Sequence, residues 1–248
     1  MRNFEGKTVV VTGGGGGIGG ATCRRFASEG AQVAVFDMNL EAAEKVADGI
    51  RAAGGVAQAF KCNITDRAEV DVAVAATEAA LGPIDVLVNN AGITRDASFR
   101  KLTPQDWDSV IGTNLTGLFN TTKQVIEGML SKGWGRIINI SSINGQRGQF
   151  GQTNYSAAKA GIHGFTMALA REVSGKGVTV NTVSPGYIQT AMTAAIRPDI
   201  LEGMIAGIPV GRLGLPEEIA SIVAWLASDE SAYSTGADFS VNGGMNMQ

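Results

Sequence analysis

The chain has 248 residues, of which 44% are hydrophobic, and this is enough for one sizeable core without a division into separate domains. Twenty Lys and Arg residues against 23 Asp and Glu residues give a net charge of −3, with no basic block suited to a nucleic-acid backbone. No apolar run approaches the roughly 18 residues of a membrane span, and neither Cys23 nor Cys62 has the spacing of a zinc or disulfide site. We therefore expect one soluble, cytoplasmic domain over residues 1–248, with no nucleic-acid, membrane or metal partner.

Short β-branched runs alternate along the chain with segments of helical periodicity, at intervals of roughly 25 to 45 residues. Strands are predicted at 7–12, 32–37, 56–62, 84–89, 136–141, 178–184 and 238–241. Helices are predicted at 18–30, from 39 or 40 to 53, from 65 or 66 to 81, at 104–131, at 154–174 and at 216–228. Several of the strands are apolar without alternation, which is typical of strands covered on both faces. This order predicts an α/β fold, a single Rossmann domain with a doubly wound parallel sheet and helices on both faces.

The run T-G-G-G-G-G-I-G-G at 12–20 lies between the first predicted strand and the first predicted helix. Glycine at this place allows a tight turn, lets the backbone approach a pyrophosphate, and opens a helix whose free N–H groups attract the anion. The spacing G-x-G-x-x-G fits in two registers, beginning at Gly14 or at Gly15, and the pattern alone does not choose between them. A glycine-rich turn without a ligand is the alternative.

Asp37 ends the second predicted strand, about 20 residues after the glycines, where a carboxylate accepts the 2′-hydroxyl of an adenosine ribose. The same carboxylate would repel the 2′-phosphate of NADP(H), and residues 38–41 supply no Arg or Lys to offset the repulsion. The sequence thus favours NAD(H), with NADP(H) as the alternative cofactor. A solvated Asp37 that caps the next helix is the other interpretation.

Tyr155 and Lys159 lie four residues apart at the start of a predicted helix, and Ser142 follows a predicted strand. An ammonium about 4 Å from a phenol, at an effective dielectric constant near 20, contributes about 4 kcal/mol, or roughly three pKa units. We therefore expect the pKa of Tyr155 to be lowered toward neutrality, which would suit acid–base catalysis. Ser142 would hold the substrate oxygen, and Lys159 would also reach the nicotinamide ribose. An ordinary surface pair on a helix is the alternative.

The combined motifs resemble the short-chain dehydrogenase/reductase family along essentially the whole chain. They are T-G-x-x-x-G-x-G at 12–19, N-N-A-G at 89–92, G-T-N-L-T-G at 112–117, the serine and Y-x-x-x-K described above, and P-G-Y-I-Q-T at 185–190. The resemblance implies a seven-stranded sheet, a homotetramer, and a catalytic tetrad in which Asn114 holds a water in the relay to Lys159. The tetrad is Asn114, Ser142, Tyr155 and Lys159.

The resemblance also sets the glycine register at Gly13, Gly17 and Gly19, which we expect to resist a side chain, while Gly14 to Gly16 would tolerate small ones. Asn63 takes the position beside adenine that is usually Asp. Ile188 and Thr190 would face the nicotinamide amide. The cofactor-binding residues implied are Gly13, Gly16, Gly17, Ile18, Gly19, Asp37, Cys62, Asn63, Ile64, Asn90, Ala91, Gly92, Tyr155, Lys159, Pro185, Gly186, Ile188 and Thr190.

The second half is most similar to the acetoacetyl-CoA reductase branch of the family, through G-Q-R-G-Q-F-G-Q-T-N-Y-S-A-A-K and R-L-G-L-P-E-E-I-A-S. This resemblance implies reduction of acetoacetyl-CoA to (R)-3-hydroxybutyryl-CoA in polyhydroxybutyrate synthesis. The substrate-binding residues implied are Asp96, Ser142, Gln149, Phe150, Gln152, Tyr155, Gly186 and Tyr187.

Three alternatives to this function stay open. The first 60 residues are more similar to NAD-dependent hydroxyacyl-CoA dehydrogenases, which would run the reaction in the oxidative direction. A 3-oxoacyl-[acyl carrier protein] reductase shares the fold and tetrad, although such enzymes often carry basic residues where this chain has Gly133 and Trp134. A protein that binds the cofactor without turnover is disfavoured by the intact tetrad.

Overall fold

Parallel strands form the centre of the molecule because their apolar residues are buried from both sides. The computed structural model describes residues 4–190, 193 and 197–247. Seven strands form one sheet in the order β3-β2-β1-β4-β5-β6-β7, and every neighbouring pair is parallel. The strands are β1 (Thr8–Thr12), β2 (Gln32–Asp37), β3 (Val56–Lys61), β4 (Ile84–Asn89), β5 (Gly135–Ile140), β6 (Val178–Pro185) and β7 (Asp238–Val241). The predicted strands are therefore confirmed, with ends that differ by one residue at most.

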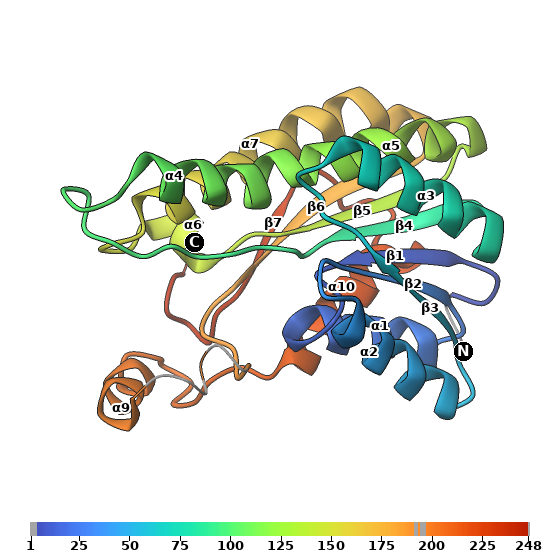
Figure 1. The fold of residues 1–248 in the computed structure, drawn as a ribbon. Helices are drawn as coiled ribbons and strands as arrows, with labels where there is room; N and C mark the ends of the chain where they lie inside the picture. The colour runs from blue at the N-terminus through green and yellow to red at the C-terminus, as the bar shows by residue number, and fades with distance from the viewer. Residues whose placement is uncertain (1–3, 191–192, 194–196, 248) are drawn as a thin grey trace.

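Helices cover both faces of this sheet (Figure 1). On one face lie α1 (Gly17–Ser28), α2 (Leu40–Ala52) and α10 (Pro216–Ala227). On the other lie α3 (Arg67–Leu81), α5 (Gly117–Lys132) and α7 (Thr153–Val173). Each face has its own apolar cluster, so the sheet divides the core into two halves. The predicted doubly wound α/β fold is thus confirmed.

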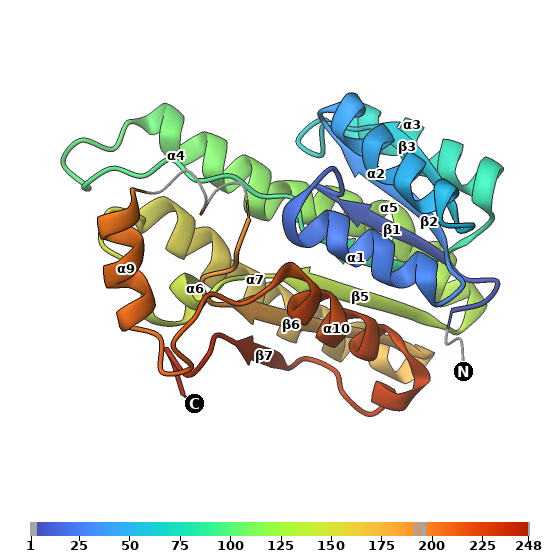
Figure 2. The same ribbon diagram turned by 90° about the horizontal axis from the view of Figure 1, so that it is seen from below.

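Shorter elements gather at the carboxyl ends of the strands, where α4 (Pro104–Ile111), α6 (Ile143–Arg147) and α9 (Pro198–Ala206) lie (Figure 2). Strand order reverses between β1 and β4, and this reversal opens a crevice at the carboxyl edge of an open α/β sheet. Three short turns complete the described elements: the π-turn η1 (Gly112–Thr116) and the 3₁₀ turns η2 (Ser174–Lys176) and η3 (Asp229–Ser231). Within the described part of the chain, none of the helices is long and apolar enough to cross a membrane.

The predicted long helix at 104–131 differs from the structure in one respect. Its hydrogen-bond pattern changes at η1, which separates α4 from α5 while the axis continues. Neither α6 nor α9 was predicted. A helix as short as α6 has too few residues to show a period, and its N-cap is Ser142, whose hydroxyl accepts the N–H of Asn144 at 3.1 Å.

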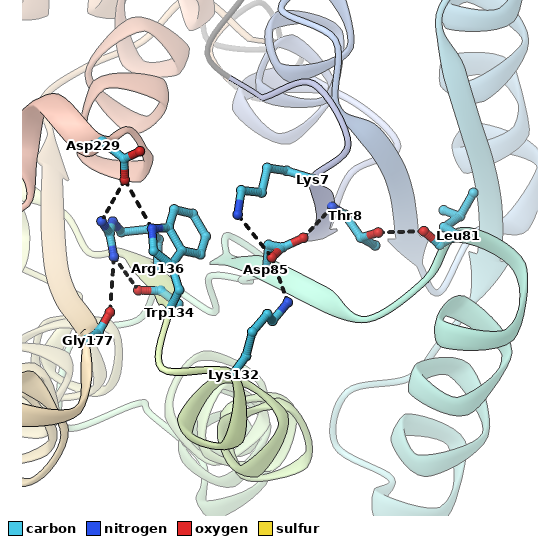
Figure 3. A network of polar contacts seen from close by, with 10 residues as sticks. Lys7, Thr8, Leu81, Asp85, Lys132, Trp134, Arg136, Gly177 and Asp229 are labelled. Carbon is cyan, nitrogen blue, oxygen red and sulfur yellow. Dashed lines mark hydrogen bonds and ion pairs between the residues drawn. The ribbon is translucent and has the colours of Figure 1, made fainter.

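A buried carboxylate fastens the opposite edge of the sheet, at the amino ends of the strands (Figure 3). Asp85, which is 5% exposed, accepts the backbone N–H of Thr8 at 2.9 Å and the ammonium of Lys132 at 2.6 Å. The ammonium of Lys7 lies 3.5 Å from the same carboxylate. Asp85 therefore joins the start of β1, the start of β4 and the end of α5.

We expect Asp85→Ala to lower the free energy of unfolding by about 2–4 kcal/mol, because it leaves a buried N–H without its acceptor and two ammonium groups without their counter-charge. Asp48→Ala is the matched control. Asp48 pairs with Arg51 at 2.6 Å on an exposed helix surface, where such a pair contributes less than about 1 kcal/mol. Urea denaturation of both variants measures the difference, and equal losses would contradict the role of Asp85.

Candidate active site

The glycine-rich turn is shaped by backbone conformation and by close approach. Gly13 and Gly17 have φ of 62° and 53°, in the left-handed region that side chains disfavour. A Cβ built on Gly19 would lie 2.1 Å from the carbonyl oxygen of Gly13. The structure therefore requires glycine at each position of the register that the family resemblance implies.

The expectation that Gly14 and Gly15 tolerate small side chains is wrong. A Cβ on Gly14 would lie 2.7 Å from a methyl carbon of Val35, and one on Gly15 would lie 2.8 Å from Oδ2 of Asp37. Gly16 has nothing within 4 Å of such an atom, so it alone of these three is open. The sequence pattern could not reveal this difference, because it depends on how closely β2 approaches the turn.

Asp37 holds the glycine-rich turn in addition to ending β2. Its Oδ2 accepts the N–H of Gly15 and its Oδ1 accepts the N–H of Asn39, both at 2.9 Å. The cap of α2 is Asn39, whose side chain accepts the N–H of Ala42 at 3.1 Å. The alternative in which Asp37 caps the helix is therefore wrong. Each carboxylate oxygen has a second lone pair, which leaves Asp37 able to accept ribose hydroxyls.

The end of β4 is fastened to the same turn by side chains of two residues. The Asn90 amide donates to the carbonyl oxygens of Thr12 at 3.0 Å and Gly13 at 3.1 Å. In return, the Thr12 hydroxyl oxygen accepts the N–H groups of Asn90 at 3.0 Å and Ala91 at 3.1 Å. Thr12 is a site residue that our sequence reasoning missed. Its position at the end of the strand before the glycines was the available signal.

The segment after β6 crosses the crevice to reach the glycine-rich turn. A Cβ on Gly17 would lie 3.4 Å from the methyl carbon of Thr190, so these two distant parts of the chain are in close proximity. Helix α1 begins at Gly17, and its N-cap, Gly16, offers no side chain to the first N–H groups. Those N–H groups and the absence of an acidic residue in the first turn suit a pyrophosphate.

Near the end of β3, Cys62 and Ile64 are buried. Asn63 lies between them, and its Oδ1 accepts the N–H and the hydroxyl of Thr65 at 3.2 and 2.9 Å. Pro185 ends β6, and a Cβ on Gly186 would lie 2.8 Å from Cα of Asn242. The roles assigned to these residues toward the cofactor stay predictions.

Lys159 is buried at the carboxyl edge of the sheet, with 3% of its surface exposed. Its Nζ donates to the carbonyl oxygen of Ile140 at 2.7 Å and lies 5.5 Å from the ring centroid of Tyr155. Burial lowers the pKa of Lys159 to about 8. The helix thus presents both side chains to the crevice, with an amine that changes charge near the working pH.

The expectation that Lys159 lowers the pKa of Tyr155 is wrong. Burial raises the pKa of Tyr155, a hydrogen bond with Ser142 offsets part of the rise, and the negative charge of Asp96 adds to it. The cost of removing a phenolate from water is the largest of these effects, and the spacing of Tyr155 and Lys159 along the chain gives no measure of it. Tyr155 is therefore a protonated phenol at neutral pH.

Asn114 lies in the π-turn η1, and its side chain holds the segment after β4. Its Oδ1 accepts the N–H of Ile93 and its Nδ2 donates to the carbonyl oxygen of Ile93, both at 2.9 Å. A Cβ on Gly92 would lie 2.5 Å from that Oδ1 and 3.6 Å from Nζ of Lys159. Asn114 and Lys159 therefore flank Gly92. A water held between them stays a prediction.

Residues 7–201 match the family described as short chain dehydrogenase. The chain belongs to the short-chain dehydrogenase/reductase family. It is 61% identical over 242 residues to an acetoacetyl-CoA reductase of Cupriavidus necator, covering 97% of this chain and 98% of that protein. A second acetoacetyl-CoA reductase, from Allochromatium vinosum, is 51% identical over 243 residues and covers 97% and 99%. A 3-oxoacyl-[acyl-carrier-protein] reductase of Escherichia coli is 45% identical over 245 residues and covers 99% of both chains.

Family membership makes this chain an oxidoreductase that depends on NAD(P)(H). The open backbone at Gly16, the uncapped start of α1 and the carboxylate of Asp37 form a crevice that fits such a dinucleotide. When bound there, the nicotinamide would supply or accept a hydride. Among the described residues, no cluster of His, Cys, Asp and Glu has the form of a metal site.

Some of the predicted substrate residues of this dehydrogenase lie together, and others do not. The Gln152 amide donates to Asp96 at 2.8 Å, and the charge of Asp96 acts on Tyr155. Gln149 and Phe150 are exposed on the loop after α6, where the Phe150 ring is 89% exposed. Gly186 and Tyr187 line a small, mainly apolar cavity behind the end of β6, together with Ile188, Ile208 and Ile219. Contact of any of them with substrate stays a prediction.

We expect Lys159→Met to stabilise the isolated protein by about 1–3 kcal/mol at pH 7, while it abolishes activity. The pKa of Lys159 is about 8 in the folded protein and ordinarily 10.5, so the unfolded chain binds the proton more readily. Wild-type stability therefore rises with pH between these values, and the advantage of the variant disappears over the same range. Denaturant titrations at pH 7 to 10 measure the difference in the free energy of unfolding between Lys159→Met and wild type. A variant that is less stable than wild type at pH 7, or a difference that does not narrow as the pH rises, would contradict the buried ammonium.

Proposed function

We propose that this chain is an NADH-preferring reductase that converts acetoacetyl-CoA, a short 3-oxoacyl-CoA, to (R)-3-hydroxybutyryl-CoA. The observation that carries the proposal is the protonated, partly buried Tyr155 beside Ser142 and Lys159 at the carboxyl edge. The relative of 61% identity, itself named an acetoacetyl-CoA reductase, supports the choice of substrate.

The side chains suit the proposed reduction. The Ser142 hydroxyl accepts the N–H of Asn144 at 3.1 Å and forms a hydrogen bond with Tyr155, and its hydrogen would turn to the C3 ketone oxygen when the substrate is bound. Tyr155 would give its proton to that oxygen as hydride reaches C3, and Lys159, with a pKa of about 8, would restore the proton. The alternative of alcohol oxidation would use the same side chains in reverse, and the name of the relative of 61% identity, a reductase, favours reduction.

A 3-oxoacyl-[acyl carrier protein] reductase is the second candidate, because the Escherichia coli relative with that name is 45% identical. The turn before β5 favours a CoA thioester over a carrier-protein thioester as the substrate. Trp134 is placed there between the ammonium of Lys7, 3.8 Å from its ring centroid, and the guanidinium of Arg136 at 4.3 Å (Figure 3). Its indole N–H and Arg136 both bind Asp229, so this turn presents no unpaired basic side chain to an acidic carrier protein.

Tyr155→Phe should lower kcat for acetoacetyl-CoA reduction by about 10²- to 10⁴-fold with NADH binding retained, because only the proton donor is removed. The measurement is initial rates of NADH oxidation, with cofactor binding followed by fluorescence. Reduction of acetoacetyl-CoA that persists in Tyr155→Phe would contradict the proposed mechanism. A carrier-bound 3-oxoacyl thioester that gives the higher kcat/KM would favour the second candidate.

The preference for NADH rests on charge and on space at the glycine-rich turn. Asp37 presents a carboxylate where a 2′-phosphate would lie, and the next residue, Met38, is 67% exposed and uncharged. Gly16 is the open position of the turn and carries no basic side chain. Both features disfavour NADPH.

The double variant Gly16→Arg with Asp37→Ser should raise kcat/KM for NADPH by at least about tenfold and lower it for NADH, because it replaces repulsion by attraction. The matched control is Gly15→Arg, whose Cβ would lie 2.8 Å from Asp37 and which should impair the use of both cofactors. Steady-state kinetics with each cofactor measure the change. A wild-type enzyme that prefers NADPH would refute the role of Asp37.

We also propose that the chain is a single domain over residues 1–248 and assembles as a homotetramer in the cytoplasm, where it would serve polyhydroxybutyrate synthesis. One continuous sheet from β1 to β7 supports the single domain. Exposed apolar rings and chains on α4, α5 and α7, namely Trp107, Phe119 and Met167, support a subunit contact on that face. Size-exclusion chromatography with light scattering tests the assembly.

A further inference from the structure

The residue before the proton donor is as deeply buried as any in the molecule. Asn154 is 0% exposed, and its amide lies in the first turn of α7 next to Tyr155. A polar side chain at such a site loses its hydration and is retained only where its hydrogen bonds are made inside the protein. Its partners therefore indicate what the residue does.

Each end of the Asn154 amide has a different partner. Its Oδ1 accepts the backbone N–H of Tyr155 at 2.8 Å. Its Nδ2 donates to the carbonyl oxygen of Arg95 at 3.0 Å and to that of Asp106 in α4 at 3.4 Å. A rotated amide would place its oxygen against two carbonyl oxygens and its NH₂ against an N–H. These partners allow a single orientation.

Helix α7 depends on this side chain because its start has no other cap. The N-cap residue, Gln152, makes no side-chain hydrogen bond to the helix, and its amide instead joins Asp96 to Asn144. An N–H in the first helical turn has no partner within the helix. Asn154 supplies that partner to Tyr155 from inside the turn.

The other end of the amide reaches the segment 93–97, which connects β4 to the loop before α4 and has no regular structure. Neighbouring residues of this segment are fastened to the same side of the site. Ile93 is held by Asn114, Asp96 by Gln152, and the N–H of Ala97 donates to the carbonyl oxygen of Gly151 at 2.9 Å. Asn154 binds the same segment at Arg95, and it also accepts the backbone N–H of Tyr155.

We propose that Asn154 is a positioning residue for the proton donor: its amide fixes the first turn of α7, and with it Tyr155, against the segment 93–97 and helix α4. The inference deepens the proposed function and rests on it for the identity of the ketone. Asn154 does not touch the reacting atoms. It acts by holding the phenol at the distance from the ketone that the segment 93–97 defines.

The test compares Asn154→Ser with Asn181→Ser. Asn181 is also 0% exposed, donates to the carbonyl oxygen of Ser234 at 2.7 Å and accepts the N–H of Ala237 at 3.2 Å, but it lies in β6 and neither hydrogen bond involves a site residue. Serine at 154 keeps a small polar side chain, but it is too short to reach the carbonyl oxygens of Arg95 and Asp106. Asn154→Leu is the second variant, should the shorter side chain prevent folding. It fills a similar volume and removes both donors and the acceptor without burying a charge.

With acetoacetyl-CoA and NADH, we expect both Asn154 variants to lose about 10- to 100-fold in kcat, with KM for NADH within about twofold of wild type. The solvent deuterium isotope effect on kcat should increase, because a displaced phenol slows proton transfer. Asn181→Ser should keep kcat within about twofold of wild type even if its Tm falls as far as that of the Asn154 variants. The proposal would be overturned if, at the same loss of Tm, the Asn154 variants lost no more kcat than Asn181→Ser and their solvent isotope effect were unchanged.

A measurement without substrate separates the two hypotheses. Tyrosinate absorbance in a pH titration, with Tyr155→Phe to identify its contribution among the three tyrosines, reports the environment of the phenol alone. In Asn154→Ser the phenol should become more exposed, so the pKa of Tyr155 should fall toward its ordinary value. Wild-type protein that does not reduce acetoacetyl-CoA would refute the proposed function. An unchanged titration of Tyr155 would refute the role of Asn154, whatever the substrate is.

Discussion

A buried ammonium governs the arrangement of the site. Lys159 has almost no exposed surface, so its charge must be compensated by oxygen atoms of the protein or released as a proton. The carbonyl oxygen of Ile140 provides one partner at 2.7 Å, and the end of β5 must therefore face the helix closely. The Ser141 hydroxyl, which donates to the carbonyl oxygen of Lys159 at 2.9 Å, fixes the same approach from the backbone. The site can exist only where β5 and α7 are in contact.

The close contact between β5 and α7 explains two glycines outside the glycine-rich turn. A Cβ on Gly145 would lie 2.8 Å from the carbonyl carbon of Lys159, so α6 can pass α7 only with glycine at this position. Gly92 fills the same need between Lys159 and Asn114. Further along the same strand and helix, a side-chain hydrogen bond also connects β5 to α7, because Asn139 donates to Thr166 at 2.9 Å. Polar groups thus set the spacing of strand and helix, which apolar packing alone would leave free to slide.

How far the sequence predicts this molecule depends on the range of the interactions concerned. Strands such as β1 and β4 contain the apolar runs V-V-V and V-L-V, and these runs, together with the turn residues between them, predict the strands and the parallel sheet. Tyr155, Lys159 and Ser142 are predictable because their spacing places them at one edge. The role of Asn154 is not, since it depends on two carbonyl oxygens from residues far away in the sequence. The direction of the Tyr155 pKa failed for the same reason, because burial is a property of the fold and has no signature in the spacing.

The hydrogen bond between Asp37 and Gly15 gives the proposed preference for NADH a structural side as well as an electrostatic one. The carboxylate that would repel a 2′-phosphate is also the acceptor that holds the turn through the N–H of Gly15. Removing the charge by Asp37→Ala would leave that N–H without its acceptor and loosen the turn that is proposed to contact either cofactor. A replacement that keeps an oxygen near the same place would separate the two effects. Selection for a different cofactor would therefore have to act on the turn and on the end of β2 together.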